Sequence, residues 1–209
     1  MTTAPVEEVL AAIDSMDLAA PWADVSPGLR LVLPRRRPMP PGTGSLPVRR
    51  YPAGIDAGLG LDIGPAMLFV GFEQLRTWEV AEDAAFDRAE ANVDERVRAR
   101  RHWTLISEPI GSVPTIAFQS REGWASSLVL MPEVLCRILG ERSGRILAPM
   151  RDLVMWMPLD TEIDFARWVL DEMAQADPNA LDVPVLTLVD GEFATPGSRM
   201  PPGAASRTH

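Results

Sequence analysis

Hydrophobic and polar positions follow two different periods in different parts of the chain. Residues 55–63 place an apolar side chain at every second position, which predicts a strand with one face in water. Residues 82–97 repeat apolar side chains at helical spacing, which predicts an amphipathic helix. The predicted buried stripe of that helix consists of Phe86, Ala89, Val93 and Val97.

The same two periods predict the other elements of the chain. Strands and helices come in blocks rather than in strict alternation. Further helices are predicted from about Thr3 to Pro21 and at 72–78, 132–139 and 161–175. Further strands are predicted at 28–33, 46–51, 66–72, 103–107, 113–118, 145–149, 153–157 and 185–193, with the 103–107 and 113–118 strands forming a hairpin around Gly111. This order predicts an α+β fold with a mixed, largely antiparallel sheet and helices packed mainly on one face.

Proline, glycine and charge mark the boundaries between parts of the chain. Residues 1–33 form an N-terminal helix and a short strand, and 34–45 form a linker rich in proline and arginine. Residues 46–196 form the α+β domain, and 197–209 form a disordered tail that lacks apolar periodicity.

The stretch "RDLVMWMP" contains a strand, Leu153 to Met157, whose one polar side-chain group is the indole N–H of Trp156. A strand that is apolar on both faces is usually a central strand covered on both sides, so plain core is the favoured interpretation. The alternative is an outer face left for a partner, to which flexible methionine side chains would adapt. The candidate partner surface consists of Met155, Trp156, Met157, Arg151, Asp152 and Trp124.

Composition excludes several classes of function. The chain has 209 residues and a net charge of −9, which argues against nucleic-acid binding. It contains no lysine, which excludes Schiff-base chemistry and a phosphate-loop lysine. No apolar run is long enough to span a membrane, and no secretion signal is visible. Together with a single cysteine, this predicts a cytoplasmic protein without a membrane partner.

Side chains that carry chemistry are sparse. "GLGLDIG" at 58–64 lies in a strand pattern without a following helix, so it predicts no dinucleotide site. His102 and Cys136 cannot assemble a zinc site alone, and Cys136 lies among apolar neighbours. Asn92 is interpreted as a buried, hydrogen-bonded amide. No catalytic, cofactor-binding or metal-binding residue is therefore predicted.

The order of several segments resembles the YtpQ-like family of uncharacterised bacterial proteins, over about residues 46–196. The segments are "LPVRR", "EQL" with "AEANV", "EGWASSLVLMPEVL", "LAPMRDLVMW" and "LVDGEF". This chain has Glu122, Trp124, Ala125 and Leu128 where the family has Asp, Tyr, Asp and Arg. The resemblance implies a shared shape, and the family's own role is unknown.

Three functions follow as hypotheses. The scarcity of catalytic side chains favours a non-enzymatic domain that binds a protein or peptide. The alternative from another class is a small hydrolase or transferase that uses carboxylates, with Asp152 and Glu122 as the pair. A third is an acidic immunity-type protein that neutralises a basic toxin, because residues 46–196 hold 24 acidic residues and 14 arginines, a net charge of −10.

Overall fold

A computed structural model describes residues 6–15, 17, 20–36, 46–63, 67–100, 102–175, 177 and 179–194. The predicted tail at 197–209 and most of the predicted linker therefore lie outside the described residues. The contacts divide the chain into two compact units. Unit 1 comprises 1–32, 39–49 and 57–99, and unit 2 comprises 33–38, 50–56 and 100–209.

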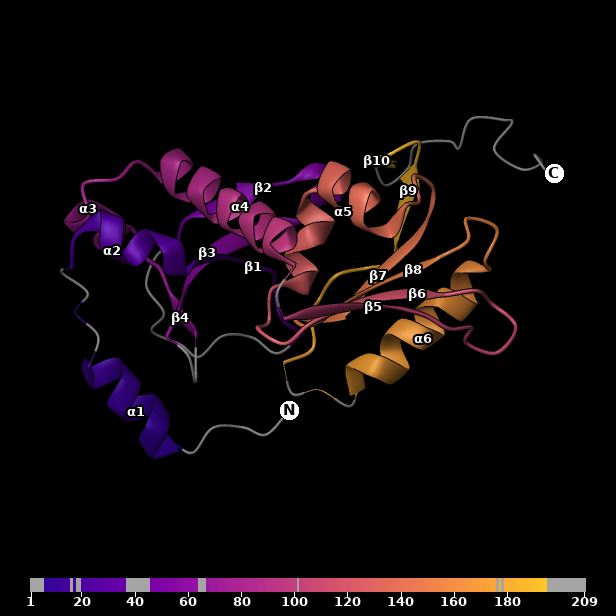
Figure 1. The fold of residues 1–209 in the computed structure, drawn as a ribbon, viewed down its shortest axis with the longest axis horizontal. Coiled ribbons are helices and arrows are strands. Elements are labelled where there is room, and N and C mark those ends of the chain that lie inside the picture. The colour runs from indigo at the N-terminus through magenta and orange to yellow at the C-terminus, as the bar shows by residue number, and fades with distance from the viewer. Residues whose placement is uncertain are drawn as a thin grey trace. The chain divides into compact units, whose positions relative to one another are not determined.

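Unit 1 is built on a small sheet in the strand order β1-β3-β2, and β4 pairs with residues 60–62 of β3 (Figure 1). The strands are β1 (Leu29–Val32), β2 (Val48–Arg50), β3 (Asp56–Asp62) and β4 (Met67–Phe69). The helices are α1 (Val6–Ser15), α2 (Trp22–Val25), α3 (Phe72–Thr77) and α4 (Glu82–Ala99), with the 3-10 turn η1 (Ser26–Gly28) between α2 and β1. The 3-10 turn η2 (Pro52–Gly54) belongs to unit 2. The predicted strand at 55–63 and helix at 82–97 are confirmed.

Helix α4 packs on β1 through the predicted apolar stripe. Phe86, Ala89 and Val93 are fully buried, and Asn92 is buried beside them. The Asn92 side-chain amide donates hydrogen bonds to the carbonyl oxygens of Ser26 (2.8 Å) and Leu29 (3.0 Å). The prediction that Asn92 is a buried, hydrogen-bonded amide is confirmed, and it fastens the start of β1 to α4.

Arg49, the middle residue of β2, binds this strand to α4. Its guanidinium forms ion pairs with Asp83 (3.0 Å), Asp87 (2.8 Å) and Glu90 (3.0 Å). The same group lies 4.8 Å from the centre of the Phe86 ring, where a guanidinium is attracted by the ring face. A planar cation with several donors suits this position, and a lysine would not replace it.

Unit 2 is built on a six-stranded sheet in the order β10-β9-β7-β8-β6-β5, in which every pair is antiparallel. The strands are β5 (Trp103–Ser107), β6 (Ile116–Ser120), β7 (Gly144–Met150), β8 (Leu153–Met157), β9 (Leu186–Val189) and β10 (Glu192–Phe193). The helices are the 3-10 helix η3 (Ala125–Leu130), α5 (Pro132–Leu139) and α6 (Ile163–Gln175). The α+β class and the antiparallel pairing are confirmed.

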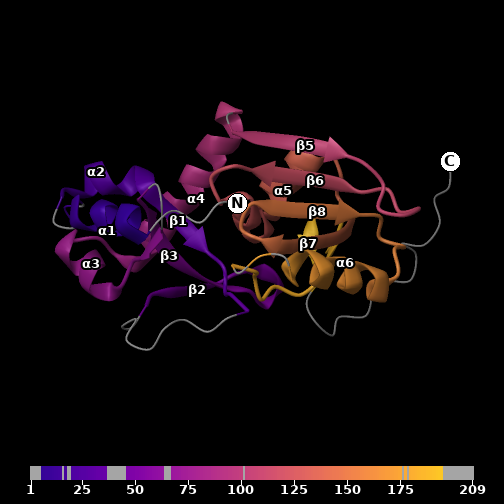
Figure 2. The same cartoon turned by 90° about the horizontal axis from the view of Figure 1, so that it is seen from below.

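Helices cover both faces of the six-stranded sheet rather than mainly one. Figures 1 and 2 show α5 and α6 on opposite sides of it. Helix α6 packs on β7, and η3 contacts β6, β7 and β8 and adjoins α5. The helical layer on the second face, which includes η3, was not predicted because "ASSLVL" has no helical period. All six of its side chains are nevertheless buried.

The beginning of the predicted linker is paired with unit 2. Arg35 forms a β-bridge with Leu181, and the backbone N–H of Arg36 donates to the Ala180 carbonyl (3.0 Å). The Arg36 guanidinium also pairs with Asp171 of α6 at 2.6 Å. The contacts thus place residues 33–36 in unit 2, whereas β1 pairs with β3 in unit 1. The boundary between the two units therefore differs from the predicted domain boundaries, which follow residues 33 and 45. Long-range strand pairing decides it, and local sequence patterns do not carry that information.

Candidate functional site

The apolar stripe Leu153–Met157 is core on both faces. Leu153, Met155 and Met157 are buried in one cluster with Ala166, Val169 and Leu170 of α6. Val154 is fully buried on the other face of β8, the face that η3 covers. The favoured interpretation of this strand as core is therefore the one that the burial supports.

Trp156 also belongs to the core, and its polar atom is satisfied. The indole is 9% exposed, and its Nε1–H donates to the Ser143 carbonyl oxygen at 2.9 Å. A Cβ added at Gly144 would lie 2.1 Å from this Nε1, so the strand packs closely against the ring. Trp124 is 1% exposed and contacts Phe118 edge to face, with 5.5 Å between ring centres.

The candidate partner surface is therefore corrected at four of its six residues. Met155, Trp156, Met157 and Trp124 are buried. Their side chains do not form a surface, because η3 and α6 cover the two faces on which they lie. Only the remaining two residues, Arg151 and Asp152 in the turn between β7 and β8, are partly accessible.

This turn is held by the last residue of β6 and by the start of η3. The backbone N–H groups of Ser120 and Ser126 donate to the carbonyl oxygens of Asp152 (2.8 Å) and Arg151 (3.0 Å). Gly123, at φ +71°, lies against the Asp152 carboxyl, and a Cβ there would be 3.3 Å from its Oδ1. Glycine at this position therefore permits the close approach of loop and turn.

Four charged groups from distant parts of unit 2 meet at this turn. They are Arg35, Arg151, Asp152 and Asp177, and the charges of Arg151 and Asp177 act on both Arg35 and Asp152. Burial raises the pKa of the Asp152 carboxyl, and Asp177 raises it further, while Arg151 and the Gly123 backbone N–H lower it. Burial and the Arg151 charge lower the pKa of Arg35, against the effect of Asp177.

Glu122, the partner of Asp152 in the carboxylate hypothesis, is more exposed. Its carboxylate lies 3.9 Å from Nε2 of His102, which is itself exposed. Gly123, which lies against the Asp152 carboxyl, directly follows Glu122 in the chain. Both carboxylates therefore belong to one corner of unit 2. The two acids thus occupy different environments, one half-buried and one near an imidazole.

The single cysteine lines an open cavity at the end of α5. The cavity has a volume of about 580 Å³ and is lined by Glu133, Cys136, Arg137, Gly140, Arg142 and Gly191. Burial raises the pKa of the Cys136 thiol, which outweighs the lowering effect of Arg142. The thiol form is therefore favoured at neutral pH, and it is a poor nucleophile.

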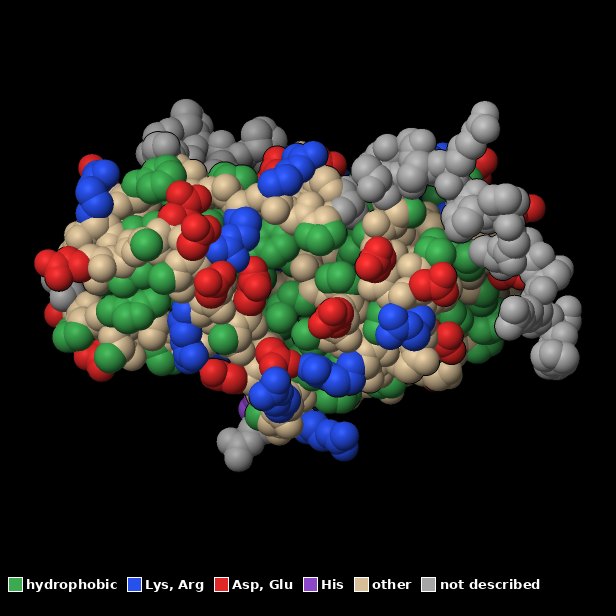
Figure 3. Space-filling model, turned by 90° about the horizontal axis from the view of Figure 1, so that it is seen from above, with side chains coloured by type: hydrophobic (Ala, Val, Ile, Leu, Met, Phe, Trp, Pro, Cys, Tyr) green, Lys and Arg blue, Asp and Glu red, His purple; other side chains and the backbone are tan. Residues whose placement is uncertain are grey.

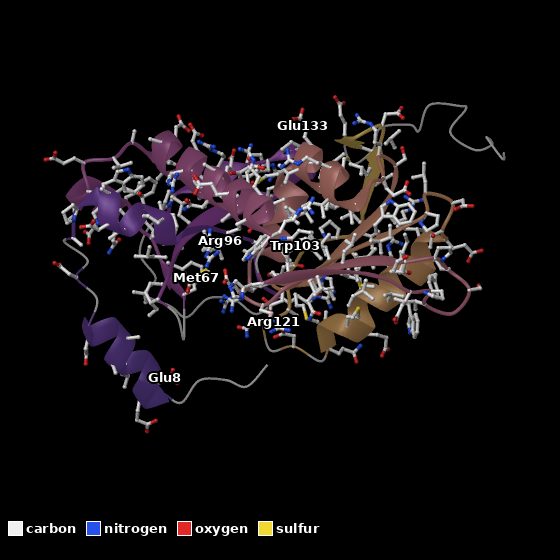
Figure 4. The ribbon with its side chains drawn as sticks, in the orientation of Figure 1. Glu8, Met67, Arg96, Trp103, Arg121 and Glu133 are labelled. Carbon is white, nitrogen blue, oxygen red and sulfur yellow. The ribbon has the colours of Figure 1, made fainter. Side chains whose placement is uncertain are left out.

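The outer edge of the six-stranded sheet is a feature that sequence reasoning missed. Strand β5 is the last strand, and no other described strand pairs with its outer side (Figure 2). Four of its five residues are exposed, including Leu105 (45%) and Ile106 (39%). Trp103, at the start of β5 (Figure 4), is half-buried and lies 5.0 Å from the Phe118 ring.

The direction of the backbone groups in β5 follows from two hydrogen bonds beyond its ends. The N–H of Glu108 donates to the Thr115 carbonyl (3.1 Å), and the N–H of Arg121 donates to the His102 carbonyl (2.9 Å). Antiparallel pairing alternates, so Thr104 and Ile106 direct their N–H and C=O groups towards β6. Trp103, Leu105 and Ser107 therefore direct theirs outward.

Surface charge and metal-binding side chains do not define a further site among the described residues. On the face shown in Figure 3, acidic side chains and arginines are interspersed with hydrophobic ones. Among the described residues, no group of three or more His, Cys, Asp or Glu side chains is placed to hold a metal ion. None of the described helices combines the length and apolar character that crossing a membrane requires.

Comparison with known proteins gives no match: no family model, no curated protein and no solved structure matches the chain. What the chain does is therefore inferred from the geometry and chemistry of its own residues. Two features stand out by geometry. One is the outward edge of β5, and the other is the charged corner around Asp152.

Proposed function

We propose that this chain is a non-enzymatic protein-binding domain that accepts an extended segment of a partner chain as an added strand on β5. The observation that carries the proposal is the outward edge formed by Trp103, Leu105 and Ser107. A row of outward N–H and C=O groups is a template for another strand, because the incoming backbone can pair with every group. We further propose a cytoplasmic location and membership in the YtpQ-like family.

The composition of β5 supports binding rather than protection. Soluble proteins usually block an edge strand with proline, with charged side chains, with a bulge or with a covering segment. The five residues Trp103–Ser107 contain no proline and no charge, and their pairing with β6 is regular. An exposed apolar strand without such devices is expected to be covered by a partner in its working state.

The side chains of β5 indicate the kind of segment that fits. Leu105 and Ile106 lie on opposite faces of the sheet, and both are exposed. A partner strand with apolar side chains on both faces would cover them. A segment with like charges at successive positions would gain nothing from either contact.

The test compares capture by variants of the full chain used as bait in native lysate. Leu105→Pro removes an outward N–H, and proline is tolerated on an edge strand at such a position. Trp168→Arg is the matched control, because it replaces an exposed aromatic side chain of α6 far along the chain from β5.

The wild type and Trp168→Arg should capture the same protein, and Leu105→Pro should lose at least about 90% of it. Melting curves of the three baits show whether each is folded. Equal capture by a folded Leu105→Pro bait would contradict the proposal.

A second candidate function, a small hydrolase or transferase, is supported by one observation. Asp152 is a half-buried carboxyl whose pKa is raised by burial, beside the guanidinium of Arg151. Raised carboxyl pKa values are common among catalytic acids. Turnover of any ester or phosphate substrate that Asp152→Asn abolishes, in a variant that stays folded, would favour this candidate over strand addition.

A further inference from the structure

We infer that the strand added to β5 is β5 of a second copy of this chain, in an antiparallel pair with its two-fold axis at Leu105. This inference rests on the proposed function, because it names the occupant of the same edge. The outward edge carries it: the backbone, the side chains and the flanking charges of β5 are each complementary to themselves in this register.

The backbone of β5 is complementary to itself in this register. The outward residues Trp103, Leu105 and Ser107 are symmetric about Leu105. In an antiparallel pair centred there, Leu105 faces Leu105 of the other copy, and Trp103 faces Ser107. Each outward N–H then has an outward C=O opposite it. A shift of the pairing by two residues would move Trp103 or Ser107 of each copy beyond the partner strand and leave its groups in water.

The side chains agree with this register. Leu105 meets Leu105 across the axis and Thr104 meets Ile106, so the central contacts are apolar or β-branched, and the small Ser107 faces the large Trp103 at each end. These residues are exposed in the single chain, and the pairing would cover them. No charged side chain of the strand faces another, because Trp103–Ser107 contains none.

The charges beside the strand favour the antiparallel orientation. Arg100 and His102 precede β5, and Glu108 follows it, and all three are exposed. Antiparallel pairing brings Glu108 of one copy beside His102 of the other. Parallel pairing would instead place the Arg100 side chains of the two copies at the same end, which opposes association.

The expected dimer is weak. Stable protein interfaces bury about 1,200–2,000 Å² in total, and a pair of five-residue edge strands buries less than that. Association should therefore depend on concentration, with a dissociation constant in the micromolar range or above. This predicts reversible pairing rather than an obligate dimer.

The register is tested by single-cysteine cross-linking of the full chain. Residues that face each other across the axis have Cα atoms about 5.5 Å apart, which a disulfide spans. Leu105→Cys should therefore form a covalent dimer on mild oxidation. Ser107→Cys should not, because its two copies would lie roughly 13 Å apart along the strands. The wild type is the reference for the buried Cys136.

Sedimentation velocity over a range of concentrations completes the test. The wild type should shift from monomer to dimer as concentration rises, and Leu105→Pro should stay monomeric. A wild type that stays monomeric, or a Ser107→Cys variant that cross-links as well as Leu105→Cys, would overturn the inference. If β5-dependent capture of another protein persists with a monomeric wild type, the second copy is excluded and strand addition stands. If the wild type stays monomeric and capture does not depend on β5, both fail.

Discussion

Leu105 lies directly opposite Phe118 in the β5–β6 pair, yet Phe118 is fully buried and Leu105 is 45% exposed. Residues directly opposite in an antiparallel pair share a face of the sheet. The sheet therefore passes from core to solvent between two neighbouring strands. One more strand beside β5 would continue the covered face, which is the physical reason for placing a partner there.

Substitutions on either face of β8 should destabilise the protein, because both faces of this strand are core. Met155→Ala should lower the free energy of unfolding by about 2–5 kcal/mol and Trp156→Ala by about 3–5 kcal/mol, because each leaves a cavity in a covered layer. Leu105→Ala should cost well under about 1 kcal/mol, because its side chain is already in contact with water. Urea unfolding measures all three. A near-neutral Met155→Ala would show that α6 does not cover β8.

Asn92→Ala should lower the free energy of unfolding by about 2–4 kcal/mol. The substitution leaves the carbonyl oxygens of Ser26 and Leu29 without the amide that now donates to them in a buried position. Gln119→Ala, at an exposed position of β6, is the control and should change stability by less than about 0.5 kcal/mol. Equal stability of the two variants would contradict the role given to Asn92.

Asp152→Asn should stabilise the protein more at neutral than at acid pH. Burial raises the pKa of Asp152 above the value of about 3.9 for an unfolded chain, so between these values the folded state binds more protons. Stability due to this group therefore falls as pH rises through that window. The asparagine variant does not have this loss.

Thermal unfolding of the wild type and Asp152→Asn at about pH 7 and about pH 3.5 measures the difference. The advantage of the variant should be larger at the higher pH. A variant that is less stable than the wild type at pH 7 would mean that the attraction of Arg151 outweighs the effect of burial.

Gly144→Ala should destabilise unit 2 by about 3 kcal/mol or more. An added Cβ would lie 2.1 Å from Trp156 Nε1 and 2.5 Å from the Met157 carbonyl oxygen, and the backbone oxygen cannot move away without breaking the strand pair. Gly58→Ala is the matched control in another strand, where the nearest atom would be 3.7 Å away. It should leave the urea midpoint unchanged or slightly raised.

Local pattern was sufficient for the elements that are periodic or bounded by turn residues. The helices at 82–97 and 132–139, the hairpin around Gly111 and the two strands on either side of Arg151 and Asp152 are all found. The 3-10 helix η3 was missed because a 3-10 turn has no amphipathic period of its own. Without η3, the second cover of Trp156 could not be predicted.

The site depends on strand order, which no local pattern contains. "WTLIS" predicts a strand, but whether it lies at the edge or the centre follows from the order β10-β9-β7-β8-β6-β5. The charged corner is equally non-local, since Arg35, Asp152 and Asp177 come from three separate parts of the chain. Arg151 and Asp152 were predicted as part of a partner surface, and Arg35 and Asp177 are brought near them only by the fold.

Residue-resolved amide hydrogen exchange in β5 tests the central claim most directly. In dilute wild-type chain, the amides of Thr104 and Ile106 should exchange slowly because they face β6, whereas those of Trp103, Leu105 and Ser107 should exchange fast. When a strand is added, by a bound partner or by raising the chain concentration, the three outward amides should slow together by about tenfold or more. Outward amides that are already protected in dilute chain, or that still exchange fast when a partner is bound, would contradict strand addition at β5.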